Sequence, residues 1–285
     1  MNWLIKQDRF LGLNADLAQA KWLYFGIPMD FTGSFQPGAR FGPGRVREAS
    51  YGIETYSLAL DRDLEDLAIF DGGDLELPFG NVTESLSRIG DISSWILSQN
   101  KRFLAVGGEH LVTLPLIQSV VRTYPDVTVV HFDAHADLRD EYLGERLSHA
   151  TVLRRVSEQL EPQHLYQFGI RSATRDEVQY ARRTSHFYPH QVLQPFLQCL
   201  PELKGRPIYV TMDVDVIDPA FMPGTGTPEP GGISAGEALQ AVRLLSDLDV
   251  VGMDVVETMP ANDISQRSAV LTAKIVREAL LAIYR

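Results

Sequence analysis

Asp133, His135 and Asp137, spaced two residues apart, could together bind a metal ion. They follow the apolar, β-branched segment 127–132, which predicts a buried strand. In an extended strand, residues two positions apart project from one face, so the three side chains would converge. Open α/β sheets bind ligands at the carboxyl ends of their strands. The pattern therefore predicts a site at this strand end, and a solvated edge strand is the weaker alternative.

Two other predicted strand ends carry residues of the same kind. His110 follows the strand 103–106 after a Gly-Gly-Glu segment, and Asp213 and Asp215 follow the strand 207–212. The two aspartates again have a spacing of two, which predicts a shared face. We expect six side chains to lie together at the strand ends: His110, Asp133, His135, Asp137, Asp213 and Asp215.

Such a cluster predicts metal chemistry. Carboxylates repel one another and require a cation when they are gathered in one place. Oxygen-rich ligation with some imidazole suits Mn²⁺ better than Zn²⁺, which prefers Cys and His in closed tetrahedra. Two ions roughly 3.5–4 Å apart can share such ligands, hold a hydroxide and lower its pKa towards neutrality. The residues therefore predict a two-metal hydrolase.

The elements that would position these residues alternate along the chain. Strands are predicted over 21–28, 67–70, 103–106, 127–132, 165–170, 207–212 and 248–256. Helices are predicted over 83–99, with Thr83 as N-cap, and over 111–124, 148–156, 175–183 and 269–283. Short connections without repeats or linkers predict one α/β domain over 1–285, with a mostly parallel sheet.

The segment 30–47 is rich in glycine and proline. It lacks the Lys-Ser/Thr of a phosphate-binding loop. We expect a structured loop near the site or at a subunit contact. Arg40, Arg45 and Arg47 are expected to be ordinary surface or interface charges.

The composition bounds the class of partner. The 285 residues include 26 Lys and Arg against 37 Asp and Glu, a net charge of −11, which argues against nucleic acid or an anionic membrane surface. No apolar run approaches the roughly 18–20 residues of a membrane span, and the first residues do not resemble a signal peptide. The single cysteine, Cys199, offers neither a disulfide nor a cysteine zinc site. We expect a cytoplasmic enzyme.

The sequence resembles the ureohydrolases, the arginase and agmatinase family, along nearly its whole length. The matching segments are Gly-Gly-Glu-His at 107–110, Asp-Ala-His-Ala-Asp at 133–137, Ser-His at 148–149, Met-Asp-Val-Asp-Val-Ile-Asp-Pro at 212–219, Gly-Thr-Gly-Thr-Pro at 224–228 and Gly-Met-Asp-Val-Val-Glu at 252–257. The resemblance implies a three-layer, arginase-type α/β fold with a mostly parallel central sheet and helices on both faces. It also implies two Mn²⁺ per chain and a homo-oligomer, either a trimer or a hexamer.

The resemblance further implies a division of the ligands. One ion would be held by His110, Asp133, Asp137 and Asp213, and the other by His135, Asp133, Asp213 and Asp215, so that Asp133 and Asp213 bridge. In the family's chemistry a bridging hydroxide attacks the guanidinium carbon, and Asp137 helps to pass its proton to the leaving nitrogen.

Two further residues receive catalytic or binding roles from the resemblance. Glu257 would pair with the guanidinium, because a carboxylate fork fits a planar cation, and the alternative is a supporting role behind the ligands. His149 would shuttle protons and contact substrate, and its alternative is a helix cap. Thr227 is also assigned to substrate binding. His131 is expected in the core or behind the ligands, Asp254 as a support, and Asp218 in a turn.

The sequence gives less information on the residues that bind the end of the substrate remote from the guanidinium. The segment 138–142 differs from the arginase pattern that holds an amino acid, and it is similar to that of agmatinases. We assign Arg139 and Asp140 to substrate binding, and expect some of Asp140, Glu141 and Glu145 to face a cationic amine. The prediction is hydrolysis of agmatine to putrescine and urea. Because Arg139 could hold a carboxylate, a guanidinobutyrase or another guanidino-acid ureohydrolase is the alternative.

Two readings from other classes stay open at this point. A mononuclear zinc deacylase on the related deacetylase fold would need fewer aspartates. A catalytically inactive regulatory homologue would have lost ligands, whereas all six are present. The sequence alone does not fix the substrate's chain length, the cellular metal or the oligomer size.

Overall fold

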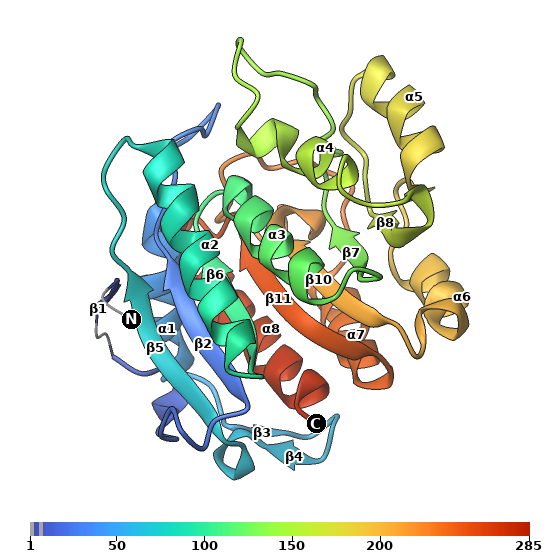
Figure 1. Ribbon diagram of the computed structural model, residues 1–285. Coiled ribbons are helices and arrows are strands. Elements are labelled where there is room, and N and C mark those ends of the chain that lie inside the picture. The colour runs from blue at the N-terminus through green and yellow to red at the C-terminus, as the bar shows by residue number, and fades with distance from the viewer. Residues whose placement is uncertain (1–2, 6–7) are drawn as a thin grey trace.

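A nine-stranded sheet forms the centre of the computed structural model, which describes residues 3–5 and 8–285 (Figure 1). The strand order is β1-β5-β2-β6-β11-β10-β7-β8-β9. All neighbours are parallel except β1, which pairs antiparallel with β5. The strands are β1 (Leu4–Ile5), β2 (Trp22–Ile27), β5 (Ile69–Leu75), β6 (Arg102–Gly107), β7 (Thr128–Phe132), β8 (Leu165–Phe168), β9 (His186–Tyr188), β10 (Pro207–Asp213) and β11 (Asp249–Val256). A separate small sheet pairs β3 (Tyr56–Ser57) with β4 (Arg62–Asp63).

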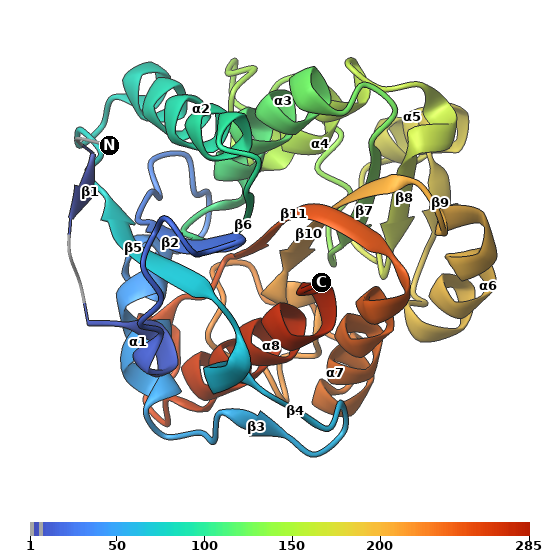
Figure 2. The same cartoon turned by 60° about the horizontal axis from the view of Figure 1, so that its bottom comes forward.

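Helices cover both faces of the central sheet (Figure 2). One face is covered by α2 (Val82–Ser98), α3 (Thr113–Thr123), α4 (Val152–Ser157) and α5 (Arg175–Thr184). The other is covered by α1 (Gly42–Ser50), α6 (Leu193–Leu203), α7 (Ala235–Arg243) and α8 (Arg267–Ile283). The three-layer α/β fold is confirmed. Within the described residues, no helix combines the length and apolar character needed to cross a membrane.

The central strands are mostly apolar because both of their faces are covered. Every residue of β2 and of β7 is buried. Strands from early and late parts of the chain are neighbours, since β6 pairs with β11. This mixing favours one domain over 1–285, which stays a prediction.

Several predicted boundaries were wrong. The side chain of Asn81, not Thr83, caps α2 by accepting a hydrogen bond from the Glu84 amide over 3.1 Å. Strand β5 continues through Asp71 and Asp74 rather than ending at residue 70. The helices α1, α6 and α7 were not predicted at all.

Arg47 is the clearest correction. It was expected at the surface, but it is only 1% exposed. Its guanidinium lies 3.1 Å from Asp71 Oδ1, is bonded to Asp74 and stands 4.8 Å over the ring of Tyr24. Because a buried charge requires such partners, the ion pairs tie α1 to the sheet. Arg45, in contrast, forms an exposed pair with Glu48.

Candidate metal centre and substrate pocket

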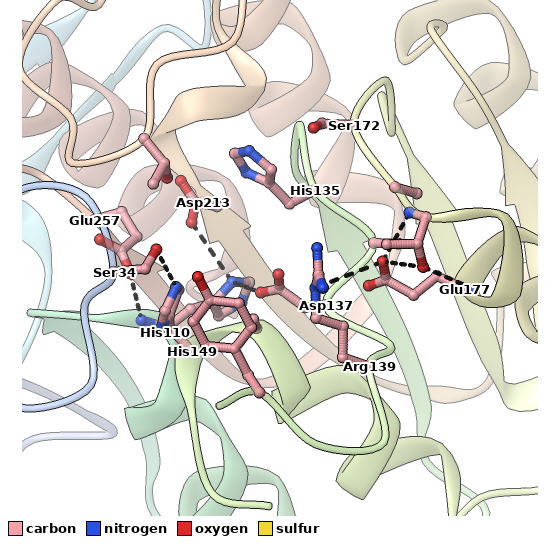
Figure 3. A pocket seen from close by; sticks show the side chains of 16 residues that line it. Ser34, His110, His135, Asp137, Arg139, His149, Ser172, Glu177, Asp213 and Glu257 are labelled. Atoms are coloured by element: carbon pink, nitrogen blue, oxygen red, sulfur yellow. Dashed lines mark hydrogen bonds and ion pairs between the residues drawn. The ribbon is translucent and has the colours of Figure 1, made fainter. Parts of the chain in front are cut away.

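The six predicted ligands lie at the carboxyl ends of β6, β7 and β10, and β11 lies between β6 and β10 in the sheet. Figure 3 shows four of them: His110, His135, Asp137 and Asp213. His110 begins a short 3-10 turn three residues after β6, Asp133 follows β7 directly, and Asp213 ends β10. Met212 is paired with Phe132 in the sheet, so Asp213 and Asp133 leave it at the same level.

Turns, not strand alternation, bring the side chains together. Strand β7 ends at Phe132, before all three of its predicted ligands, and Asp137 has a left-handed φ of 53°. Asp215 lies in a 3-10 turn, where its amide donates to Asp213 Oδ1 over 2.8 Å. The predicted extended geometry therefore does not include Asp137 or Asp215, although the predicted convergence is present.

His110 Nδ1 points at three carboxylate oxygens. It lies 3.1 Å from Asp133 Oδ2, 3.1 Å from Asp137 Oδ2 and 3.5 Å from Asp213 Oδ2. The atom is buried and has no hydrogen-bond partner with acceptable geometry. Ligands at right angles around an ion that is about 2.1 Å away lie roughly 3 Å apart. The donor set and its spacing therefore fit a divalent ion at this position.

The ring of His110 is held in the orientation that such an ion requires. Its Nε2 lies 3.0 Å from Thr211 Oγ1, and the Thr211 hydroxyl donates to Asp254 Oδ1 over 2.6 Å. Because Thr211 gives its proton to the carboxylate, its oxygen accepts from His110 Nε2. In the neutral ring, the lone pair of Nδ1 is then directed at the carboxylates and available to an ion. Asp254 is thus the support that its sequence position predicted.

A second group of possible ligands shares Asp133 with the first. His135 Nδ1 lies 2.9 Å from Asp215 Oδ2 and 3.6 Å from Asp133 Oδ1. Asp133, His135 and Asp215 are mutually close enough to hold one ion. The sharing of Asp133 between two groups agrees with a bridging role, which stays a prediction, as does the full ligand assignment.

His131 is near enough to count as a third ligand beside His110 and Asp133, but both of its ring nitrogens are engaged. Nε2 lies 2.8 Å from Asp133 Oδ2, and Nδ1 lies 3.1 Å from Gln167 Nε2. With no free lone pair directed at the cluster, His131 is a supporting residue, as expected. Asp218 is likewise found in a turn, where it accepts from the amides of residues 220, 231 and 232.

The pKa values describe a site that needs positive charge. Burial, and next the charge of Asp133, raise the pKa of Asp137 to about 7. Burial, and next the charges of Asp215 and Asp133, raise the pKa of Asp213 well above its usual value. Burial lowers the pKa of His135, but Asp215 and Asp133 outweigh it and raise this pKa to about 12. Without a cation, the cluster holds protons in its place.

An open pocket reaches the cluster. Its lining includes the ligand residues His110, His135, Asp137 and Asp213, together with Ser34, Arg139, Tyr142, His149, Glu177, Thr227 and Glu257. Asp133 and Asp215 are buried beside them. Thr227 Oγ1 lies 3.5 Å from Asp215 Oδ2. The pocket therefore joins the metal-type cluster to two further carboxylates, Glu257 and Glu177.

Glu257 is fixed directly beside His110. Its Oε1 accepts a hydrogen bond from the His110 amide over 2.8 Å, and its backbone has a left-handed φ of 67°. Burial, partly offset by this amide and increased by the charge of Glu109, raises the pKa of Glu257 to about 8. A cation in the pocket would stabilise its charged form, which suits the predicted pairing with a guanidinium.

His149 is held between two elements. Its Nε2 lies 3.1 Å from Ser34 Oγ, and its amide donates over 3.0 Å to Thr32 Oγ1, which in turn donates to Glu109 Oε2. The N-cap of the turn is Ser148, so capping does not require the His149 side chain. Burial lowers the pKa of His149 to about 4. The segment 30–47 thus lies at the site, as expected, although nothing in its sequence singled out Ser34.

At the far side of the pocket, Glu177 lies opposite Glu257 in Figure 3. It accepts from the amides of Leu138 and Thr174 over 3.1 and 2.8 Å, and Arg139 Nε lies 3.9 Å away. Glu177 was not among the predicted site residues, although Thr174-x-x-Glu177 is the pattern of a capping box.

The placement of Asp140 is a correction. Its carboxylate lies 2.6 Å from Arg155 Nη2 and does not line the pocket. Glu141 and Glu145 are also absent from the lining. The segment 139–146 instead contributes Arg139 and Tyr142, whose ring packs edge-on against His149 at 5.7 Å.

A three-layer α/β fold with a buried cluster of His and Asp at the strand ends of its sheet is typical of a metal-dependent hydrolase. The chain belongs to the arginase family, which its sequence matches over residues 20–282. It is 46% identical over 275 residues to proteins named agmatinase from Halalkalibacterium halodurans and from Bacillus subtilis, covering 95% of this chain and 95% of each relative. A solved structure from Clostridium difficile, proposed to be an agmatinase, has a TM-score of 0.92 and 40% identity, covering 94% of this chain and 99% of the other. Family membership removes the deacylase alternative.

Proposed function

We propose that this chain is an agmatinase, which hydrolyses agmatine to putrescine and urea. The observation that carries the proposal is the 46% identity over 95% of both chains to proteins named agmatinase. The guanidinobutyrase alternative is not favoured, because these relatives are named agmatinase. The presence of all six candidate ligands also argues against an inactive homologue.

The proposed cofactor is two Mn²⁺ per chain, bound by His110, Asp133, His135, Asp137, Asp213 and Asp215. When bound, the ions would supply the Lewis-acid charge that activates water near neutral pH. The support is that His110 lies near Asp133, Asp137 and Asp213 with its Nδ1 unpartnered. In addition, Asp133, His135 and Asp215 are close enough to hold one ion.

The chain's own residues would orient substrate and move protons. Glu257 would hold the guanidinium, because its Oε1 is fixed by the His110 amide while the rest of the carboxylate lines the pocket. Asp137, which lines the pocket, would pass a proton to the leaving nitrogen. His149 would exchange a proton with the product amine, and its contact with Ser34 Oγ steadies the ring.

We also propose a cytoplasmic location and a homo-oligomer, either a trimer or a hexamer. The net charge of −11 argues against a nucleic-acid partner. Light scattering coupled to size-exclusion chromatography measures the oligomer directly, and a monomer at working concentration would contradict this proposal.

The decisive experiment is a urea-release assay of the Mn²⁺-loaded protein on agmatine, arginine, 4-guanidinobutyrate and 3-guanidinopropionate. We expect the highest kcat/KM on agmatine. A discrimination of about 10²–10⁴ against arginine is the size expected when an extra carboxylate lacks a partner in the site. A faster reaction with 4-guanidinobutyrate would contradict the substrate assignment, and no urea from any substrate would contradict the reaction.

A further inference from the structure

A chain of buried hydrogen bonds leads from helix α5 to the carboxylate of Asp133. Ser185, just after α5, donates to Gln167 Oε1 over 3.1 Å. Gln167 Nε2 lies 3.1 Å from His131 Nδ1, and His131 Nε2 lies 2.8 Å from Asp133 Oδ2. Gln167 and His131 are directly paired across β8 and β7, and both are 0% exposed.

The direction of each hydrogen bond follows from one contact. Gln167 also lies 3.0 Å from the carbonyl oxygen of Ala136, which can only accept. The atom facing that oxygen is therefore the amide nitrogen, and the same nitrogen directs its second hydrogen at His131 Nδ1. Nδ1 must accept, so the ring proton is on Nε2 and is donated to Asp133 Oδ2.

We propose that Gln167 and His131 are positioning residues for the metal site. Gln167 fixes the tautomer of His131, and His131 orients the carboxylate that the two ions would share. Oδ1 of Asp133 is held separately by the amide of His135, over 2.6 Å. Each oxygen of Asp133 thus has one protein donor, which fixes the plane of the carboxylate and leaves its remaining lone pairs for ligation.

The arrangement parallels the one at His110, where Thr211 and Asp254 fix the ring from behind. Donors behind metal ligands commonly contribute about 10- to 100-fold to metal affinity. Oδ2, which receives the His131 bond, is the oxygen 3.1 Å from His110 Nδ1. Loss of the hydrogen bond from His131 to Asp133 should therefore weaken chiefly the binding of the ion on the His110 side.

The inference rests on the proposed metal site but not on the substrate, so it can fail while agmatine hydrolysis stands. Its first test needs neither metal nor substrate. In metal-free protein labelled with ¹⁵N-histidine, solid-state NMR should show His131 protonated at Nε2 and unprotonated at Nδ1, with the signal assigned by its loss in His131→Gln. A proton on Nδ1 would overturn the inference.

Variants of Gln167 extend this test. Gln167→Glu replaces the donor with an acceptor and should place a proton on His131 Nδ1. Ser185→Ala is the matched control, because the carbonyl of Ala136 still fixes the Gln167 amide, and it should leave the tautomer unchanged. An unchanged tautomer in Gln167→Glu would contradict the role of Gln167.

The second test measures Mn²⁺ affinity by titration calorimetry, with folding checked by circular dichroism. His131→Leu removes the donor and should weaken at least one ion by about tenfold. His131→Gln offers an N–H at nearly the place of the imidazole Nε2–H and should recover most of that affinity. Equal affinities for the two variants and the parent would overturn the proposal. If His131→Leu does not fold, His131→Met, which also lacks a donor, takes its place.

Discussion

The backbone amide of His110 donates a hydrogen bond to Glu257 Oε1 over 2.8 Å. This contact joins a residue proposed to ligate metal to the residue proposed to hold the guanidinium. Both follow strands that are paired in the sheet, β6 and β11, so the distance between ligand and carboxylate is set by the most buried part of the fold. A guanidinium bound by Glu257 would therefore lie directly beside the metal cluster.

Replacing Glu257 with Gln should separate substrate binding from metal binding. Glu257→Gln keeps an oxygen to accept from the His110 amide but removes the charge that pairs with the guanidinium. We expect kcat/KM on agmatine to fall by about 10²–10³, the size of a lost charged hydrogen-bond pair. Mn²⁺ content, measured by elemental analysis, should not change. Full activity in this variant would show that another group holds the guanidinium.

Asp133→Asn should lose metal and activity together. Asp133 lies 3.1 Å from His110 Nδ1 through one oxygen and 3.6 Å from His135 Nδ1 through the other. Its neutral amide would weaken both ions at once. Elemental analysis and urea release measure the two effects on one sample. A variant that keeps two ions and full turnover would contradict the ligand assignment.

His149→Asn tests proton transfer. Because burial lowers the pKa of His149 to about 4, its imidazole is neutral at neutral pH. We expect kcat to fall by about 10²-fold or more, with little change in metal content. Ser148→Ala is a useful comparison, since it removes the N-cap but keeps the imidazole. Metal loss in His149→Asn would favour a structural role.

Metal affinity should rise with pH between 6 and about 8. In the metal-free chain, burial and Asp133 raise the pKa of Asp137 to about 7. Asp215 and Asp133 outweigh burial and raise the pKa of His135 to about 12. Asp137 is therefore protonated below about pH 7 and His135 throughout this range, whereas ions bind the deprotonated forms, so binding must release protons. Calorimetry in buffers of different ionisation enthalpy measures this release. Affinity that is constant over the range would contradict the proposed ligands.

Glu177 and Arg139 should set selectivity at the far side of the pocket. Glu177→Gln keeps a residue suited to the capping box but removes a carboxylate, so KM for agmatine should rise. Arg139→Ala removes a cation and should increase the preference for agmatine over 4-guanidinobutyrate. Asp140→Asn is the matched control, because Asp140 pairs with Arg155 outside the pocket lining, and it should leave KM unchanged. If only Asp140→Asn changed KM, the corrected placement would be wrong.

The sequence by itself determined which strand ends carry His110, Asp133 and Asp213, and the kind of chemistry at those ends. Buried parallel strands are read from local apolar runs, and their carboxyl ends meet at one edge of the sheet. The identities of the side chains then imply a cation, because the carboxylates could not otherwise be buried together. These inferences need only short segments of chain.

Only the tertiary structure decided which carboxylates face the pocket. Asp140 forms an ion pair with Arg155 outside the pocket lining. Glu177, from helix α5, lines the pocket. Arg47 is buried because Asp71 and Asp74 meet it across the fold. The left-handed turn at Asp137 likewise has no local sequence signal. Each outcome depends on pairing between segments that are distant in sequence, and the free energy of such contacts exists only once the chain is packed.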